Sequence, residues 1–198
     1  MQTKSNLYIF NKTYINKIDY IKYIMEMQAT MESPSAEAQH PLHDKWVLWA
    51  HLPHDTDWTL TSYIKIMELN YVEEVISLLN SVPALMVKNC MLFFMRKGIN
   101  PTWEDSKNKD GGCFSFKVLN KNVANVWKDL SYVLTGETIS NDPKFQEKVT
   151  GITISPKKSF CILKIWMNDL NYQNPRVITN IEGLDIRGCL FKKHKPNY

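Results

Sequence analysis

The chain has 198 residues, a length that suits one compact domain with a terminal extension better than two domains. Hydrophobic residues make up 44% and charged residues 22%, which is enough for an ordinary core. No run of about 18 apolar residues predicts a membrane span. The formal net charge of +4 is compatible with an anionic ligand but is too small to indicate nucleic-acid binding by itself.

The four cysteines are widely spaced and include no C-x-x-C pair, so neither a disulfide framework nor a zinc ribbon is expected. The N-terminal residues mix Asn, Lys and Thr with apolar residues and lack the apolar core of a signal peptide. We therefore expect reduced thiols and a cytoplasmic protein without membrane contact.

The first 39 residues differ from the rest in the spacing and number of their apolar residues. Ile15, Ile18, Ile21 and Met25 recur at helical spacing. The stretch ATMESPSAEAQ that follows is poor in apolar residues, as a linker is. The sequence therefore predicts an N-terminal extension over 1–39, part of it helical, and one domain over 40–198.

From residue 40 onward, short apolar runs alternate with turn signals. The predicted strands cover residues 45–50, 60–69, 90–95, 114–119, 149–154, 160–167 and 186–191. The predicted helices cover residues 71–82, 123–134 and 175–183. Strands and helices without strict alternation indicate an α+β fold, with an antiparallel sheet and helices on one face.

Trp58 and Trp103 stand among loop residues rather than in apolar runs. Such a Trp either packs against the core or binds a flat ligand. Trp103 lies in the segment GINPTWEDSKNKDGG over 98–112, directly before Glu104. A carboxylate can accept both donors on the guanine edge, at about 1.5–3 kcal/mol each.

Stacking on an indole adds on the order of 1–3 kcal/mol per base. Methylation at N7 makes guanine cationic, and a cation over an indole gains roughly 2 kcal/mol when desolvated. Two indoles on either side of one ring would therefore select 7-methylguanine over guanine. Lysines that could meet attached phosphates cluster in a predicted hairpin, at Lys157, Lys158 and Lys164, and near the C-terminus, at Lys192, Lys193 and Lys195.

No motif indicates an enzyme or a cofactor. The sequence has no G-x-x-x-x-G-K loop, no dinucleotide-binding fingerprint and no G-x-S-x-G elbow. His51, His54, Asp55 and Asp57 lack the second, distant ligand pair that a closed metal site needs, so no metal is expected.

Four segments together resemble the eukaryotic translation initiation factor 4E family of mRNA cap-binding proteins. They are HPLHDKWVLW at 40–49, GINPTWEDSKNKDGG at 98–112, WKDLSYVLTGE at 127–137 and KIW at 164–166. The resemblance runs from about residue 40 to the C-terminus and marks the chain as a divergent member. It implies a curved antiparallel sheet of about eight strands, with three helices on its convex face and the cap on its concave face.

The resemblance also implies the roles of single residues. Trp58 and Trp103 would stack on the 7-methylguanosine cap, Glu104 would bind the guanine edge, and Trp166 would touch the N7-methyl group. The phosphate positions depart from the family pattern. Cys113 replaces a basic residue, Lys157 stands where the family has Arg, and Ile162 stands where it has Lys. Lys164, two residues after Ile162, shares its strand face and could substitute for the missing lysine.

Partner binding is the second implication, through a helical face that recruits scaffold and inhibitor proteins. The family's residues on that face are matched by His40, Pro41, Val72 and Gly136. Two positions differ: Ile76 occupies a position where the family has Trp, and Lys128 one where it has Leu. We therefore expect a monomer that binds capped mRNA and a scaffold initiation factor or a divergent equivalent. Two alternatives remain open: a cap-binding repressor or decoy that recruits no scaffold, and a protein-interaction domain without cap activity. A further hypothesis is that residues 1–39 cover the helical face.

Overall fold

The computed structural model describes residues 24–25, 39–53 and 55–195. Most of the predicted N-terminal extension, His54 and the last three residues lie outside this part. Ile24 and Met25 are helical, and Ile24 packs in the main core with 4% of its surface exposed, whereas Met25 is 62% exposed. For this pair, the prediction that put Met25 on the apolar face is wrong, because Ile24 is the buried residue.

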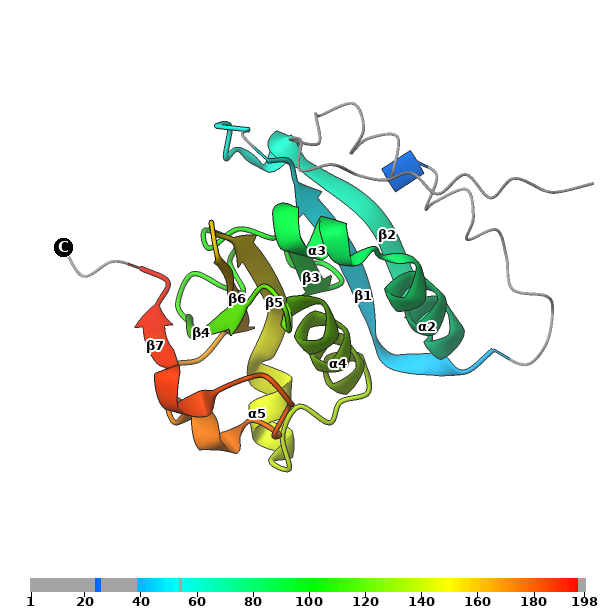
Figure 1. The fold of residues 1–198 in the computed structure, drawn as a ribbon. Coiled ribbons are helices and arrows are strands. Elements are labelled where there is room, and N and C mark those ends of the chain that lie inside the picture. The colour runs from blue at the N-terminus through cyan, green and yellow to red at the C-terminus, as the bar shows by residue number, and fades with distance from the viewer. Residues whose placement is uncertain (1–23, 26–38, 54, 196–198) are drawn as a thin grey trace, which may run out of the picture.

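A single antiparallel sheet organises the described residues (Figure 1). Its seven strands, one fewer than the approximate number expected, follow the order β2-β1-β3-β5-β6-β4-β7. In chain order the strands are β1 (Pro41–His51), β2 (Tyr63–Tyr71), β3 (Met91–Arg96), β4 (Gly112–Leu119), β5 (Val149–Pro156), β6 (Phe160–Met167) and β7 (Leu190–Lys193). The predicted α+β class and antiparallel pairing are confirmed.

Four α-helices accompany the sheet: α2 (Val72–Ser81), α3 (Ala84–Asn89), α4 (Val123–Thr135) and α5 (Pro143–Lys148). The Glu74 carboxylate at the start of α2 accepts hydrogen bonds from the Asn70 and Tyr71 amides, which satisfies backbone donors before the first turn. Pro83 follows α2 and precedes α3, as expected from its missing amide donor. The short helices α3 and α5 were not predicted.

The predicted helix over 175–183 is wrong. Only Pro175–Val177 forms a 3₁₀ turn, and Ile178 is already extended. The Thr179 amide donates to the Ile139 carbonyl, and its hydroxyl donates to the Thr138 carbonyl. Ile178 and Ile181 are buried, so their helix-like spacing reflects a loop packed onto the core.

The sheet has two unlike faces. Helices α2, α3 and α4 lie over one face (Figure 1), and the large core cluster fills the space between. A separate, smaller cluster lies on the other side of the sheet and contains Phe93, Met95, Cys113 and Trp166. We call the side with this smaller cluster the open face. Since side chains alternate along a strand, every second residue of each central strand points to it.

Candidate functional site

Trp58 lies on a ring stack that begins in the sheet. His51, the last residue of β1, is 1% exposed and stacks on Trp58 with ring centroids 4.1 Å apart and planes 1° from parallel. Tyr63 meets the His51 ring edge-on at 5.1 Å, and Phe93 supports Tyr63 in the same way at 5.2 Å. The indole is therefore docked onto the protein, although 54% of it is exposed.

The loop that carries Trp58 is shaped by its own acidic side chains. The Asp57 carboxylate accepts the Thr59 amide at 2.8 Å, and the Asp55 carboxylate accepts the Asp57 amide at 3.1 Å. The Thr59 amide holds the pKa of the Asp57 carboxyl below its usual value. The His51 Nε2–H donates to the Asp57 carbonyl at 2.7 Å, which ties the loop to the end of β1.

Trp103 and Glu104 lie on a loop that is fastened internally. The Asn108 side chain is fully buried, and its amide donates to the carbonyls of Asn100 and Thr102. The Asp105 carboxylate accepts the Asn100 amide at 2.9 Å. With the loop held from inside, Trp103 and Glu104 remain exposed, the indole by 43%.

Two glycines explain how this loop enters and leaves the sheet. Gly98 has a φ of +81°, a conformation that other residues rarely adopt. A Cβ on Gly111 would lie 1.8 Å from the Met167 carbonyl oxygen, so only glycine permits this close approach to β6. The segment that the sequence singled out is therefore a rigid turn beside the open face.

Tyr63 lies against the His51 ring on which Trp58 stacks. Burial raises the pKa of Tyr63, and the negative charge of Glu104 raises it further. The charge of Glu104 is therefore felt at a residue of the stack that supports Trp58.

Trp166, the predicted contact of the N7-methyl group, is largely covered. Only 6% of it is exposed, and its Nε1–H donates to the Thr153 hydroxyl at 3.1 Å. The His194 ring packs against it with centroids 4.6 Å apart, and the His194 Nε2–H donates to the Gly112 carbonyl. Burial lowers the pKa of His194, and the charge of Lys164 lowers it further, so a neutral imidazole covers Trp166 at neutral pH.

The predicted phosphate-binding lysines divide into two groups. Lys157 and Lys158 are exposed in the turn between β5 and β6. Lys164 lies two residues before Trp166 on β6 and shares its face, as strand alternation predicted. Cys113 pairs with Trp166 and is buried, so no cation stands at that position on β4.

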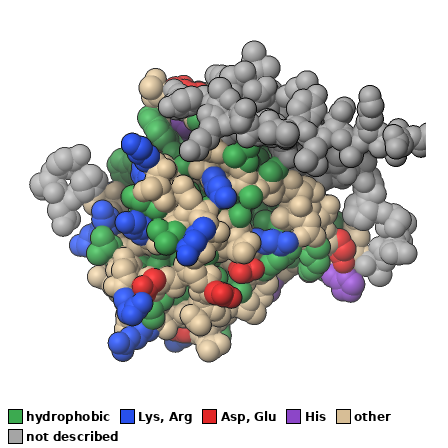
Figure 2. Space-filling view, viewed as in Figure 1, with side chains coloured by type: hydrophobic (Ala, Val, Ile, Leu, Met, Phe, Trp, Pro, Cys, Tyr) green, Lys and Arg blue, Asp and Glu red, His purple; other side chains and the backbone are tan. Residues whose placement is uncertain are grey.

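Lys192, one of the C-terminal lysines that the sequence put forward as possible phosphate contacts, lies on the open face. It pairs with Cys113 across β4 and β7, and cross-strand partners lie on the same face. Lys193 follows it, so its side chain points to the other face. In the view of Figure 2, basic side chains also gather along the β7 side of the molecule. The register of β7, which could not be read from the sequence, was the missing signal.

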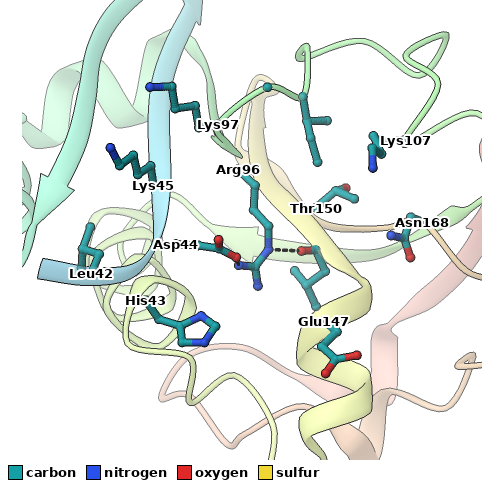
Figure 3. A pocket seen from close by; sticks show the side chains of 13 residues that line it. Leu42, His43, Asp44, Lys45, Arg96, Lys97, Lys107, Glu147, Thr150 and Asn168 are labelled. Carbon is teal, nitrogen blue, oxygen red and sulfur yellow. Dashed lines mark hydrogen bonds and ion pairs between the residues drawn. The ribbon is translucent and has the colours of Figure 1, made fainter.

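A cavity of about 550 Å³ lies elsewhere, at the opposite end of β1 from Trp58 (Figure 3). None of the four predicted cap-binding residues lines it. Inside it, Arg96 binds Asp44 and both oxygens of Glu137, and its Nε–H donates to the Val149 carbonyl. This network joins β1, β3, β5 and the end of α4, which indicates a structural role.

The same carboxylates belong to the one group in the described part whose atoms could hold a metal ion. His43, Asp44 and Glu137 have ligand atoms within 4.8 Å of one another. Because Arg96 already neutralises Asp44 and Glu137, we assign no metal there.

The predicted partner-binding residues lie along α2 and α4. His40 precedes β1 and bonds to Glu73 at the start of α2. Val72 and Ile76 follow on α2, with 38% and 45% of their surfaces exposed. Lys128 on α4 reaches across to α2, where its Nζ donates to the Asn80 side chain at 2.7 Å. The exposed Pro41 starts β1, and the exposed Gly136 follows the last residue of α4.

Comparison with known proteins decides the family. The family model described as "Eukaryotic initiation factor 4E" matches residues 41–195, most of the chain. The chain belongs to the eukaryotic initiation factor 4E family.

Relatives in this family differ in how much of the chain they match. Over 140 residues the chain is 34% identical to eukaryotic translation initiation factor 4E-1 of Schizosaccharomyces pombe, a match that covers 67% of this chain and 62% of that protein. Over 82 residues it is 35% identical to a eukaryotic translation initiation factor 4E homolog of Acanthamoeba polyphaga mimivirus, covering 41% of this chain and 26% of that one. These matches thus span less than two thirds of either relative.

Solved structures share the fold. The Schistosome eIF4E complexed with m7GpppG and 4E-BP matches with a TM-score of 0.62 and 23% identity, over 68% of this chain and 75% of that one. The Ascaris suum eIF4E-3 with m7G cap matches with a TM-score of 0.59 and 21% identity, over 70% and 79% of the two chains. No helix in the described part of the chain is both long and apolar enough to cross a membrane.

Proposed function

We propose that this protein binds the 7-methylguanosine cap of mRNA in the cytoplasm and acts in translation initiation without catalysing a reaction. Trp58 and Trp103 stack on the two faces of the base, and Glu104 accepts hydrogen bonds from its edge. The observation that carries this proposal is the exposure of the tryptophans. All six lie in the described residues, and only Trp58 and Trp103 are strongly exposed, each on a loop.

Exposed indoles are costly unless a ligand covers them. Each presents a broad apolar face to water, whereas Trp46 and Trp127 are almost completely buried in the same domain. A flat cation between Trp58 and Trp103 would cover both and gain cation–π attraction, which a neutral guanine lacks. A carboxylate in place of a neutral side chain strengthens the bonds to the base edge.

The cap's phosphates extend, in this proposal, across the β6–β4–β7 side of the open face. Lys164 on β6 and Lys192 on β7 lie on either side of Cys113 on β4. This arrangement supports phosphate binding by these two lysines in place of the basic residue that Cys113 replaces. Lys157 and Lys158 are exposed at the neighbouring β5–β6 turn and can contact a more distant phosphate. The chain's net charge of +4 is consistent with this arrangement.

Retention on immobilised 7-methyl-GTP tests the proposal. The wild-type chain should bind the resin and elute with free 7-methyl-GTP but not with GTP. Trp103→Ala and Glu104→Ala should pass through, whereas Trp103→Phe should be retained in part because it keeps an aromatic face. Thermal unfolding of each variant separates lost binding from lost folding. Elution of the wild type by GTP as readily as by 7-methyl-GTP would contradict selective cap recognition.

A second candidate is a repressor or decoy that holds capped mRNA without recruiting a scaffold protein. Two observations favour it: Ile76 is a smaller exposed contact than a Trp, and Lys128 places an ammonium group beside Asn80. A helical partner with apolar side chains would have to desolvate that charge. If the wild type fails to capture a scaffold segment while Ile76→Trp with Lys128→Leu captures it, the decoy role is favoured. Capture by the wild type favours an initiation factor.

A further inference from the structure

Trp58 is oriented before any ligand arrives. Its indole lies on the His51 imidazole with planes 1° from parallel, and the opposite indole face is open to solvent. His51 itself cannot shift easily. It is 1% exposed, Tyr63 packs against its edge, and its Nε2–H bonds to the Asp57 carbonyl. A loop tryptophan is thereby attached to β1 and β2 rather than held by the loop alone.

We propose that His51 is a positioning residue of the cap site, which holds the Trp58 indole flat against the protein so that its free face receives the methylated base. The inference rests on the proposed function of Trp58. His51, Trp58, the base and Trp103 then form four successive layers, and the first contact, between His51 and Trp58, is already present without the ligand.

The orientation of Trp58 has a consequence for affinity. A side chain that is already in its bound orientation loses less conformational freedom on binding. Stacked aromatic pairs contribute enough that loss of the His51 ring should weaken cap binding about 2- to 13-fold. Both the methylated and the unmethylated ligand should lose stacking on Trp58, and the methylated ligand should also lose cation–π attraction.

The experiment measures m7GpppG affinity by fluorescence titration in the full chain. His51→Ala should bind about 2- to 13-fold more weakly than the wild type. His51→Phe keeps a flat aromatic ring behind Trp58, so it should recover most of the wild-type affinity. His43→Phe, which replaces an exposed histidine outside the stack, should keep the wild-type affinity.

A ligand-free measurement keeps this inference distinct from the cap proposal. In proton NMR the indole ring current should shift the His51 ring protons upfield, and Trp58→Ala should remove that shift. Identical affinities for the wild type, His51→Ala and His51→Phe would overturn the inference even if the wild type binds the cap. No m7GpppG binding by the wild type would refute the proposed function, and with it the role of His51, while the ring-current shift would still report the stack.

Discussion

Replacing Lys192 with alanine tests whether the phosphates of the cap follow β7. Lys192 pairs with Cys113, which pairs with Trp166, so two strand spacings, about 10 Å, separate Lys192 from Trp166. A base near Trp166 would thus leave its phosphates within reach of the lysine stem. At about 5 Å in a watery setting, one pair of unit charges contributes about 0.8 kcal/mol. We expect Lys192→Ala to weaken 7-methyl-GTP binding about 4-fold.

Lys193 is the matched control, since Lys193→Ala removes the same charge from the next residue, whose side chain lies on the other face. The assay compares 7-methyl-GTP with 7-methylguanosine, which has no phosphates. Lys192→Ala should change only the first affinity, and the change should shrink in 1 M salt, where the Debye length falls to about 3 Å. Equal effects of the two substitutions, or equal effects on the two ligands, would refute the reasoning.

Three further predictions concern other parts of the chain. Ile24→Ala should lower the free energy of unfolding, measured in urea, by about 2–5 kcal/mol because Ile24 is buried. Met25 is exposed, so Met25→Ala should change the free energy of unfolding by less than about 0.5 kcal/mol, and similar losses in the two variants would contradict this packing. Glu104→Gln should weaken 7-methyl-GTP binding about 10- to 100-fold in a fluorescence titration, and an unchanged affinity would exclude carboxylate recognition. Burial raises the pKa of Cys189 to about 11, so iodoacetamide should modify it slowly at pH 8 by mass spectrometry, and rapid modification would disprove that burial.

Strand positions were largely predictable because half-buried strands carry an alternating pattern. The predicted strand over 160–167 matches β6, where Cys161, Leu163 and Ile165 face the core. The spacing of apolar residues gave a wrong prediction for residues 175–183, which were expected to be a helix. A loop pressed against a core also buries residues at irregular intervals, and only the hydrogen bonds from Thr179 to Thr138 and Ile139 show that it is not a helix.

The candidate site was predictable where one short segment contains its chemistry. Trp103 and Glu104 are adjacent, and the glycines and proline around them indicate a fixed turn. The stacking role of His51 and the sheet face of Lys192 could not be recognised in this way. His51 attracted attention only as a possible metal ligand, because its position between Trp58 and Tyr63 depends on the pairing of β1 with β2.

The most direct test of the account is a pair of titrations with 7-methyl-GTP and GTP, followed by tryptophan fluorescence. Trp58 and Trp103 are the strongly exposed indoles, so a ligand between them should quench emission. The cation–π gain of roughly 2 kcal/mol predicts about 30-fold tighter binding of the methylated nucleotide, and Trp103→Ala should abolish the difference. Equal affinity for both nucleotides, or no quenching by either, would contradict cap recognition and favour a protein-interaction domain that uses its helical face.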